Sequence, residues 1–187
     1  MTFDVSRYRT GYSLAVGGVT LSGSRVLLVH RAPGSGPGAD TWALPGGFVE
    51  QRESVHAAVQ REVFEETGVQ AEVVGLIAAM NRVLDDENNT YLIFLLETES
   101  GNARADGIEV DDARFVTLKE LWRLPRLQSL TRLIVTPILQ GEVTVLTSFP
   151  HPRTLPNKGM LYAGESTREG HEQMCRALLG KQDKRKR

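Results

Sequence analysis

Apolar and polar positions follow two periods along this chain, one typical of strands and one typical of helices. Two short runs rich in β-branched and leucine side chains, 12–20 and 25–30, are separated by four residues that include a glycine, the pattern of a β-hairpin. Over 55–66 the apolar side chains instead recur every three or four residues, and Gly68 supplies the left-handed stop at which many helices end. The sequence therefore predicts a hairpin followed by an amphipathic helix.

Strand and helix patterns also alternate downstream. Apolar runs at 71–80 and 90–97 predict two strands around a polar turn at 85–89, and a polar stretch at 100–112 precedes a strand at 113–117. Strands on both sides of a central helix predict an α/β fold, with a mixed sheet between helices. The other predicted elements are a helical turn through Leu121, a helix over 127–138 that Pro137 kinks or ends, an edge strand at 142–147 and a helix at 166–179.

Residues 32–40 hold three glycines and two prolines, a composition that disfavours regular structure. We therefore expect a mobile loop there, well placed to form the rim of a substrate site.

The predicted helix at 55–66 carries acidic residues on its apolar side. At 100° per residue, Glu62 and Glu66 lie in the apolar stripe, and Glu65 lies at its margin. Carboxylates that point towards a core repel one another and lose solvation, so they persist only when protons, bases or hard metal ions neutralise them. Because Arg61 can neutralise at most one, a magnesium or manganese site is the economical explanation.

The residues around this stripe have a recognisable spacing. It reads Gly47, five residues, Glu53, seven residues, Arg61-Glu62-Val63, any residue, Glu65-Glu66, any residue, Gly68-Val69. This pattern resembles the Nudix box without a mismatch. The resemblance extends more weakly over residues 10–140, and it implies the Nudix α/β/α sandwich with a central mixed sheet.

By this resemblance, the box acids and the carbonyl before the box glycine bind a divalent metal, Mg²⁺ or Mn²⁺. Arg61 orients the carboxylates and Glu53 braces the loop before the helix, although a surface salt bridge is the alternative for both. The glycines of the box fit a backbone close to metal or phosphate, but a plain turn would also explain them. The predicted metal ligands are Glu62, Glu65, Glu66 and Gly46, with Glu66 foremost.

The implied reaction is hydrolysis of the diphosphate linkage between a nucleoside diphosphate and another group, by attack of water on phosphorus. Metal ions would neutralise developing charge and lower the pKa of the attacking water. The general base is a box glutamate in some relatives, here Glu62, and an acid on a later loop in others. Among Glu109, Asp111 and Asp112 on that loop we favour Glu109.

Substrate choice in this family depends on residues outside the box. No proline lies in 70–99, where similar ADP-ribose hydrolases tend to carry one, and Tyr91 lies further downstream than the tyrosine of dinucleoside polyphosphate hydrolases. Arg31, Trp42 and Arg82 are candidate substrate contacts, each with an ordinary surface or packing explanation. The predicted substrate is a small-molecule nucleotide, either a nucleoside triphosphate or a nucleotide sugar such as ADP-ribose.

Composition and charge refine the domain organisation. With 187 residues, 41% hydrophobic and 24% charged, the chain is expected to form one Nudix hydrolase domain, 1–149, followed by an extension, 150–187, with one helix and a basic disordered end. That extension carries nine basic and four acidic side chains. This charge could attract nucleic acid, or it could belong to a solvated chain terminus. The alternatives to the enzyme above are an RNA 5′-end pyrophosphohydrolase and a Nudix-like sensor that binds a nucleotide without turnover.

No export signal or membrane-spanning stretch is evident, and the longest uninterrupted apolar run covers only 91–96. The single cysteine, Cys175, excludes an intramolecular disulfide framework. We therefore expect a cytoplasmic protein without a membrane segment, and a homodimer remains open.

Overall fold

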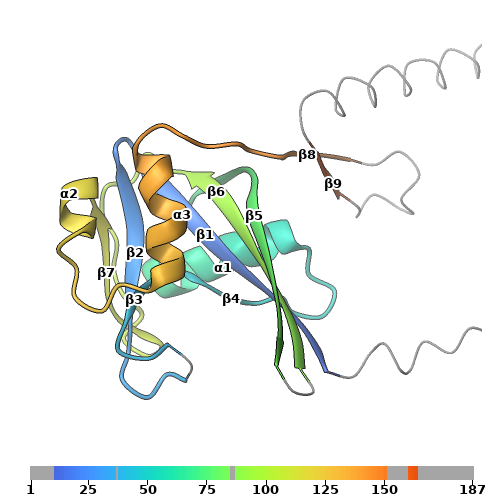
Figure 1. Cartoon of the computed structure of the whole chain (residues 1–187), viewed down its shortest axis with the longest axis horizontal. Coiled ribbons are helices and arrows are strands. Elements are labelled where there is room, and N and C mark those ends of the chain that lie inside the picture. The colour runs from blue at the N-terminus through green and yellow to red at the C-terminus, as the bar shows by residue number, and fades with distance from the viewer. Residues whose placement is uncertain (1–10, 37, 85–86, 151–159, 164–187) are drawn as a thin grey trace, which may run out of the picture.

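The chain folds as an α/β/α sandwich, which confirms the predicted fold class. The computed structural model describes residues 11–36, 38–84, 87–150 and 160–163. A seven-stranded mixed sheet lies between α1 (Val55–Thr67) on one face and α2 (Leu118–Leu121) with α3 (Ser129–Leu139) on the other (Figure 1). No helix among the described residues is long and apolar enough to cross a membrane.

The sheet is organised around a central pair of parallel strands, β1 and β6, whose neighbours are antiparallel. The strand order is β3-β2-β1-β6-β5, with β4 paired to β1 and β7 paired to β2. Its strands are β1 (Tyr12–Ser22), β2 (Arg25–Arg31), β3 (Trp42–Ala43), β4 (Gly46–Phe48), β5 (Glu72–Leu84), β6 (Glu87–Glu97) and β7 (Val110–Val116).

The predicted hairpin, the central helix and its left-handed end at Gly68 (φ 67°) are confirmed. The predicted turn at 85–89 is too long, because β5 and β6 continue pairing to Leu84↔Glu87. The short strands β3 and β4 were not predicted, since they lie in a segment rich in glycine and proline.

The predicted edge strand at 142–147 is wrong. Only Thr147 of that range belongs to a strand, because β8 (Thr147–Pro150) pairs with β9 (Met160–Ala163), while Leu146 makes a single bridge to Leu76. Pro137 lies in the last turn of α3, which ends two residues later. The predicted helix at 166–179 lies outside the described residues, and the division at 149/150 stays a prediction.

Two apolar clusters cover the two faces of the sheet. Side chains alternate along β6, so Phe94 and Leu96 pack towards α1, whereas Ile93 and Leu95 pack towards α2 and α3. The residues of β1 and β6 therefore alternate between the face that packs against α1 and the face that packs against α2 and α3. The first of these faces lies beneath the acidic stripe.

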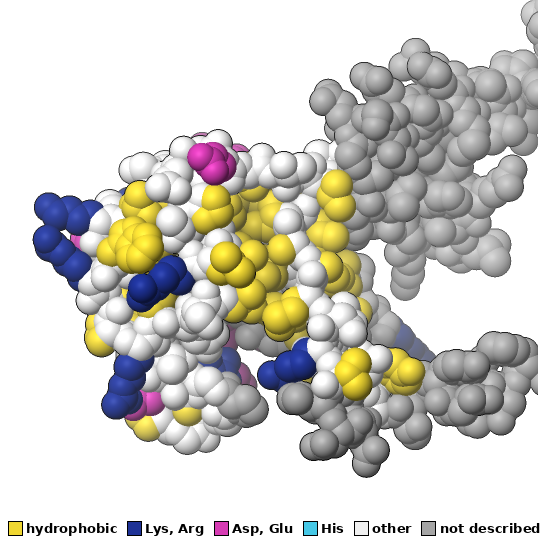
Figure 2. All heavy atoms as spheres, in the orientation of Figure 1, with side chains coloured by type: hydrophobic (Ala, Val, Ile, Leu, Met, Phe, Trp, Pro, Cys, Tyr) yellow, Lys and Arg dark blue, Asp and Glu magenta, His cyan; other side chains and the backbone are white. Residues whose placement is uncertain are grey.

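The outer face of α3 is apolar. Leu133 and Trp122 are 70% and 54% exposed, and the Arg132 guanidinium lies 5.1 Å from the centre of the Trp122 ring. Figure 2 shows hydrophobic side chains gathered over this side of the molecule. This face lies across the sheet from α1, and the question of a homodimer stays open.

Gly18 sets how closely α1 approaches the sheet. A Cβ at this position would lie 2.8 Å from Val63 Cγ2 and 3.0 Å from Leu96 Cδ1, both in the cluster beneath α1. We expect Gly18→Ala to lower the free energy of unfolding by about 1–3 kcal/mol, because the core there is already filled. Urea denaturation would measure this loss.

The matched control is Gly101→Ala, whose new Cβ would meet only the end of the Arg25 side chain, at 3.0 Å. Equal unfolding free energies for the two variants would contradict the tight packing at Gly18.

Candidate functional site

Strand β4 brings two glycines against the acidic side of α1. Gly46 pairs with Gly17 of β1, and a Cβ at Gly46 would lie 2.1 Å from the carbonyl oxygen of Val16. A Cβ at Gly47 would lie 2.6 Å from the Glu62 carboxylate. Close approach of bare backbone to a neighbouring strand and to a carboxylate therefore explains both glycines.

Glu66 is the most deeply buried of the box acids, with 3% of its surface exposed. The backbone N–H of Gly46 donates to its Oε2 at 2.9 Å, but the buried Oε1 has no hydrogen-bond partner among the described residues. Burial is the main cause that raises the pKa of Glu66 to about 8, against the opposing effect of the Gly46 hydrogen bond. A hard cation would satisfy this oxygen.

Arg61 holds the other three acids of the box. Its Nε and Nη2 donate to the two carboxylate oxygens of Glu53 at 2.8 and 3.0 Å, and its Nη1 donates to Glu62 at 2.8 Å and Glu65 at 2.9 Å. Nη2 also donates to the carbonyl of Phe48 at 3.1 Å, which ties the helix to β4. The Arg61 hydrogen bond is the main cause of a lowered pKa at Glu53.

Glu62 is the second buried acid, with 13% of its side chain exposed, and burial raises its pKa despite the hydrogen bond from Arg61. Among the described residues, no three acidic, histidine or cysteine side chains form a group ready to hold a metal. The free oxygen of Glu66 and the all-oxygen donor set nevertheless fit Mg²⁺ or Mn²⁺. The ligand roles of these acids and of Gly46 stay predictions.

Two predicted residues from other elements act on the same acids. Arg31, at the end of β2, lowers the pKa of Glu66, and its buried Nε has no hydrogen-bond partner in the described part of the chain. Glu109, just before β7, raises the pKa of both Glu62 and Glu66. The carbonyl of Glu109 accepts a 2.9 Å hydrogen bond from Ala32, which fixes this loop beside the end of β2.

The other two predicted acids, Asp111 and Asp112, lie on β7 rather than on the loop, and both have partners. Asp111 lies 2.6 Å from His30 Nδ1, and Asp112 forms an ion pair with Arg114. This arrangement agrees with the preference for Glu109, whose role as a base stays a prediction.

The remaining candidate substrate contacts lie in different surroundings. Trp42 is 4% exposed within the cluster beneath α3, and the Arg114 guanidinium lies 4.6 Å from the centre of its ring. Arg82 is exposed on β5, opposite Asn89 of β6. Packing accounts for Trp42, and a substrate contact by either residue stays a prediction.

Sequence reasoning missed the role of Gly17. A Cβ there would lie 1.8 Å from the Tyr91 hydroxyl oxygen, so the phenol lies directly over this glycine. Burial raises the pKa of Tyr91, and the charge of Glu66 acts in the same direction. The signal that could have found this pair is Gly17–Gly18 inside a strand pattern, because glycine in a strand often marks close approach.

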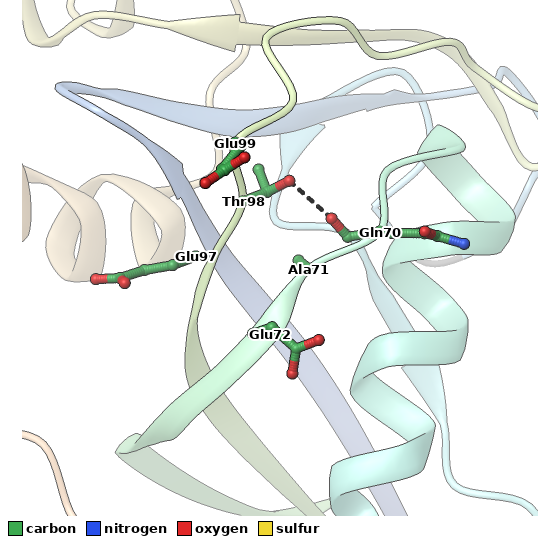
Figure 3. Close-up of a pocket in the computed structure, with 6 residues that line it drawn as sticks. All are labelled: Gln70, Ala71, Glu72, Glu97, Thr98 and Glu99. Carbon is green, nitrogen blue, oxygen red and sulfur yellow. Dashed lines mark hydrogen bonds between the residues drawn. The ribbon is translucent and has the colours of Figure 1, made fainter.

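A hollow lies beyond the carboxyl end of α1 (Figure 3). Glu72 and Glu97 lie opposite each other on β5 and β6, and Thr98 donates to the carbonyl of Gln70 at 2.7 Å. The residues that line it are Gln70, Ala71, Glu72, Glu97, Thr98 and Glu99. None of them belongs to the acidic stripe.

Comparisons with known proteins agree with this geometry. The model of the family described as NUDIX domain matches residues 11–137, more than half of the chain. The chain therefore belongs to the Nudix family, and its class is that of the Nudix pyrophosphohydrolases.

Three similar proteins illustrate the relationship. The chain is 33% identical over 128 residues to an ADP-ribose pyrophosphatase of Methanocaldococcus jannaschii, covering 66% of this chain and 72% of that protein. It is 29% identical over 119 residues to the NAD-capped RNA hydrolase NudC of Haemophilus influenzae, covering 63% of this chain but only 44% of NudC. The crystal structure of a MutT NUDIX hydrolase from Burkholderia pseudomallei superposes with a TM-score of 0.55 at 28% identity, covering 65% and 94% of the two chains.

The buried Glu66 predicts a pH-dependent stability for the metal-free protein. Its pKa rises from 4.5 to about 8 on folding, so between these values the folded state keeps a proton that the unfolded state has lost. The free energy of unfolding of the wild type should therefore fall as pH rises from about 5.5 to 8. This fall should be about 2–3 kcal/mol larger than the fall in Glu66→Gln. Denaturant titrations in EDTA at several pH values would measure this difference.

The control is Glu65→Gln, which replaces a side chain that is 57% exposed and should keep the wild-type pH slope. Mg²⁺ or Mn²⁺ added at pH 8 should restore stability to the wild type but not to Glu66→Gln. Parallel pH profiles for wild type and Glu66→Gln would contradict the burial of a proton at Glu66.

Arg61 should not be replaceable by lysine. A lysine keeps the positive charge but cannot hold both oxygens of Glu53 while reaching Glu62 and Phe48. We expect Arg61→Lys to lower the free energy of unfolding by about 1–2 kcal/mol. Denaturation beside the exposed control Arg104→Lys tests this, and equal losses in both variants would show that charge alone suffices.

Proposed function

We propose that this chain hydrolyses the diphosphate linkage of ADP-ribose or a closely similar nucleotide sugar, with Mg²⁺ or Mn²⁺ as cofactor. The observation that carries the proposal is the buried, unpartnered Oε1 of Glu66, beside the Arg31 guanidinium and the Gly46 backbone. The unpartnered carboxylate oxygen can bind a cation, and the guanidinium can bind an anion. Together they suit a diphosphate with its metal ion. The name of the M. jannaschii relative supports ADP-ribose as the substrate.

The box residues divide the work of binding. Glu66 with Glu62, Glu65 and the Gly46 carbonyl holds the ion, which, when bound, neutralises the diphosphate and lowers the pKa of the attacking water. Arg61 and Glu53 keep the carboxylates oriented, and Arg31 offers its free Nε to a phosphate oxygen.

The proton of the attacking water needs an acceptor. Glu109 is exposed, lies close enough to perturb both Glu62 and Glu66, and has no ion pair within the described residues. One carboxylate oxygen of Glu62 is already occupied by a hydrogen bond from Arg61. We therefore assign Glu109 as the general base and Glu62 as the alternative.

Hydrolysis of ADP-ribose tests the proposal. The wild type should release AMP and ribose 5-phosphate with Mg²⁺ or Mn²⁺ and stop in EDTA. Glu66→Gln should reduce kcat/KM at least ~10³-fold, because it removes a charge that only the ion can balance, and Glu109→Gln should reduce kcat ~10²-fold or more. Asp112→Asn is the matched control, since its carboxylate pairs with Arg114.

A broad panel separates the other candidates. Turnover of nucleoside triphosphates but not of ADP-ribose would identify nucleoside triphosphates as the substrate class. Tight nucleotide binding without turnover would support a sensor. The NudC relative and the basic residues of 150–187 keep RNA as a second candidate. Cleavage of capped RNA, with affinity that falls steeply with salt and on removal of 181–187, would support that candidate.

A further inference from the structure

We propose that Tyr91 is a substrate-binding residue whose hydroxyl donates a hydrogen bond to a non-bridging oxygen of the diphosphate, in a space that exists because residue 17 is glycine. The inference rests on the proposed function and adds a substrate contact that lies outside the Nudix box.

The strand arrangement places the Tyr91 ring on the face of the sheet opposite α1. Tyr91 lies beside Ala15 in the parallel β1–β6 pair, and its side chain packs with Ile93 and Leu95 in the cluster beneath α3. On β1 the residue that meets this ring is Gly17, where a Cβ would lie 1.8 Å from the hydroxyl oxygen and 2.5 Å from Cζ. Any side chain at position 17 would therefore push the phenol away.

Short contacts lead from the phenol to the acidic stripe. Gly17 pairs with Gly46, so closely that a Cβ at Gly46 would lie 2.8 Å from Gly17 Cα, and the N–H of Gly46 holds Glu66 at 2.9 Å. Both Glu66 and Arg31 act electrostatically on the phenol. The phenol therefore lies near both the Arg31 guanidinium and the Glu66 carboxylate, although its ring packs on the other face of the sheet.

The chemistry of this region favours an anionic acceptor. A buried phenol whose pKa is raised keeps its proton at all working pH values, so it is a permanent donor. In the described part of the chain its hydroxyl has no hydrogen-bond partner. If Glu66 binds an ion and its diphosphate as proposed, phosphate oxygens would be the anionic acceptors near this hydroxyl.

The first test is Tyr91→Phe, which keeps the ring and removes only the hydroxyl. With ADP-ribose and Mg²⁺ we expect kcat/KM to fall ~10–100-fold, as for a lost hydrogen bond to a charged group. Binding of the non-hydrolysable α,β-methylene analogue of ADP-ribose, measured by calorimetry, should weaken by a similar factor. Tm should stay within about 2 °C of the wild type, since packing is unchanged.

Tyr12→Phe is the matched control, because Tyr12 also belongs to the β1–β6 pair but is 57% exposed. It should leave turnover and analogue binding unchanged.

The second test concerns the space at Gly17. We expect Gly17→Ala to lower kcat/KM at least ~10-fold by displacing the phenol. In the Tyr91→Phe background the hydroxyl contact is already absent. Adding Gly17→Ala to Tyr91→Phe should therefore lower kcat/KM by less than ~3-fold. A purely structural effect of the alanine would instead multiply with that of Tyr91→Phe.

Each outcome has a distinct meaning. Wild-type turnover that Tyr91→Phe leaves within twofold, together with unchanged analogue binding, overturns the inference and leaves the proposed function standing. A wild type that neither binds the analogue nor hydrolyses ADP-ribose overturns the proposed function and the inference with it. A selective loss in Tyr91→Phe that Tyr12→Phe does not share supports the inference.

Discussion

The burial of the Glu66 carboxylate is the constraint on which the rest of the site depends. One of its oxygens is held by the backbone of Gly46 and the other has no partner in the described structure, so without a cation this side chain is stable only with a proton. Within the described fold, strand β4 places the backbone N–H of Gly46 against this buried carboxylate. Under the proposed function, this burial, which lowers the stability of the free protein, prepares the site for a metal ion and its phosphate ligand.

Arg61 limits how many charges remain unbalanced. By holding Glu53, Glu62 and Glu65 together, it leaves Glu66 as the acid with no cationic hydrogen-bond partner among the described residues of the box. The same guanidinium reaches the carbonyl of Phe48, which ties β4 to the helix. If Glu62 and Glu65 bind the proposed ion, they must be shared between arginine and ion.

Adjacent glycines of β1 serve opposite faces of the sheet. Gly18 allows Val63 of α1 to pack closely, which sets the height of the acidic stripe above the sheet, whereas Gly17 admits the Tyr91 ring on the other side. Because successive residues of a strand point to opposite faces, a two-residue segment sets both the position of the carboxylates and the space for the Tyr91 hydroxyl.

The sequence by itself determined the local features whose cause is periodic or stereochemical. These are the β1–β2 hairpin, the helix that ends at Gly68, the acidic stripe and the spacing of the box. Contacts between distant residues could not be predicted, because pairing and burial depend on the whole sheet. Only the tertiary structure placed Arg31 and Glu109 beside Glu66, buried Trp42 in the core and brought Tyr91 over Gly17. The physical reason is that periodicity fixes the face on which a side chain lies, whereas its neighbours across that face are chosen by strand order and register.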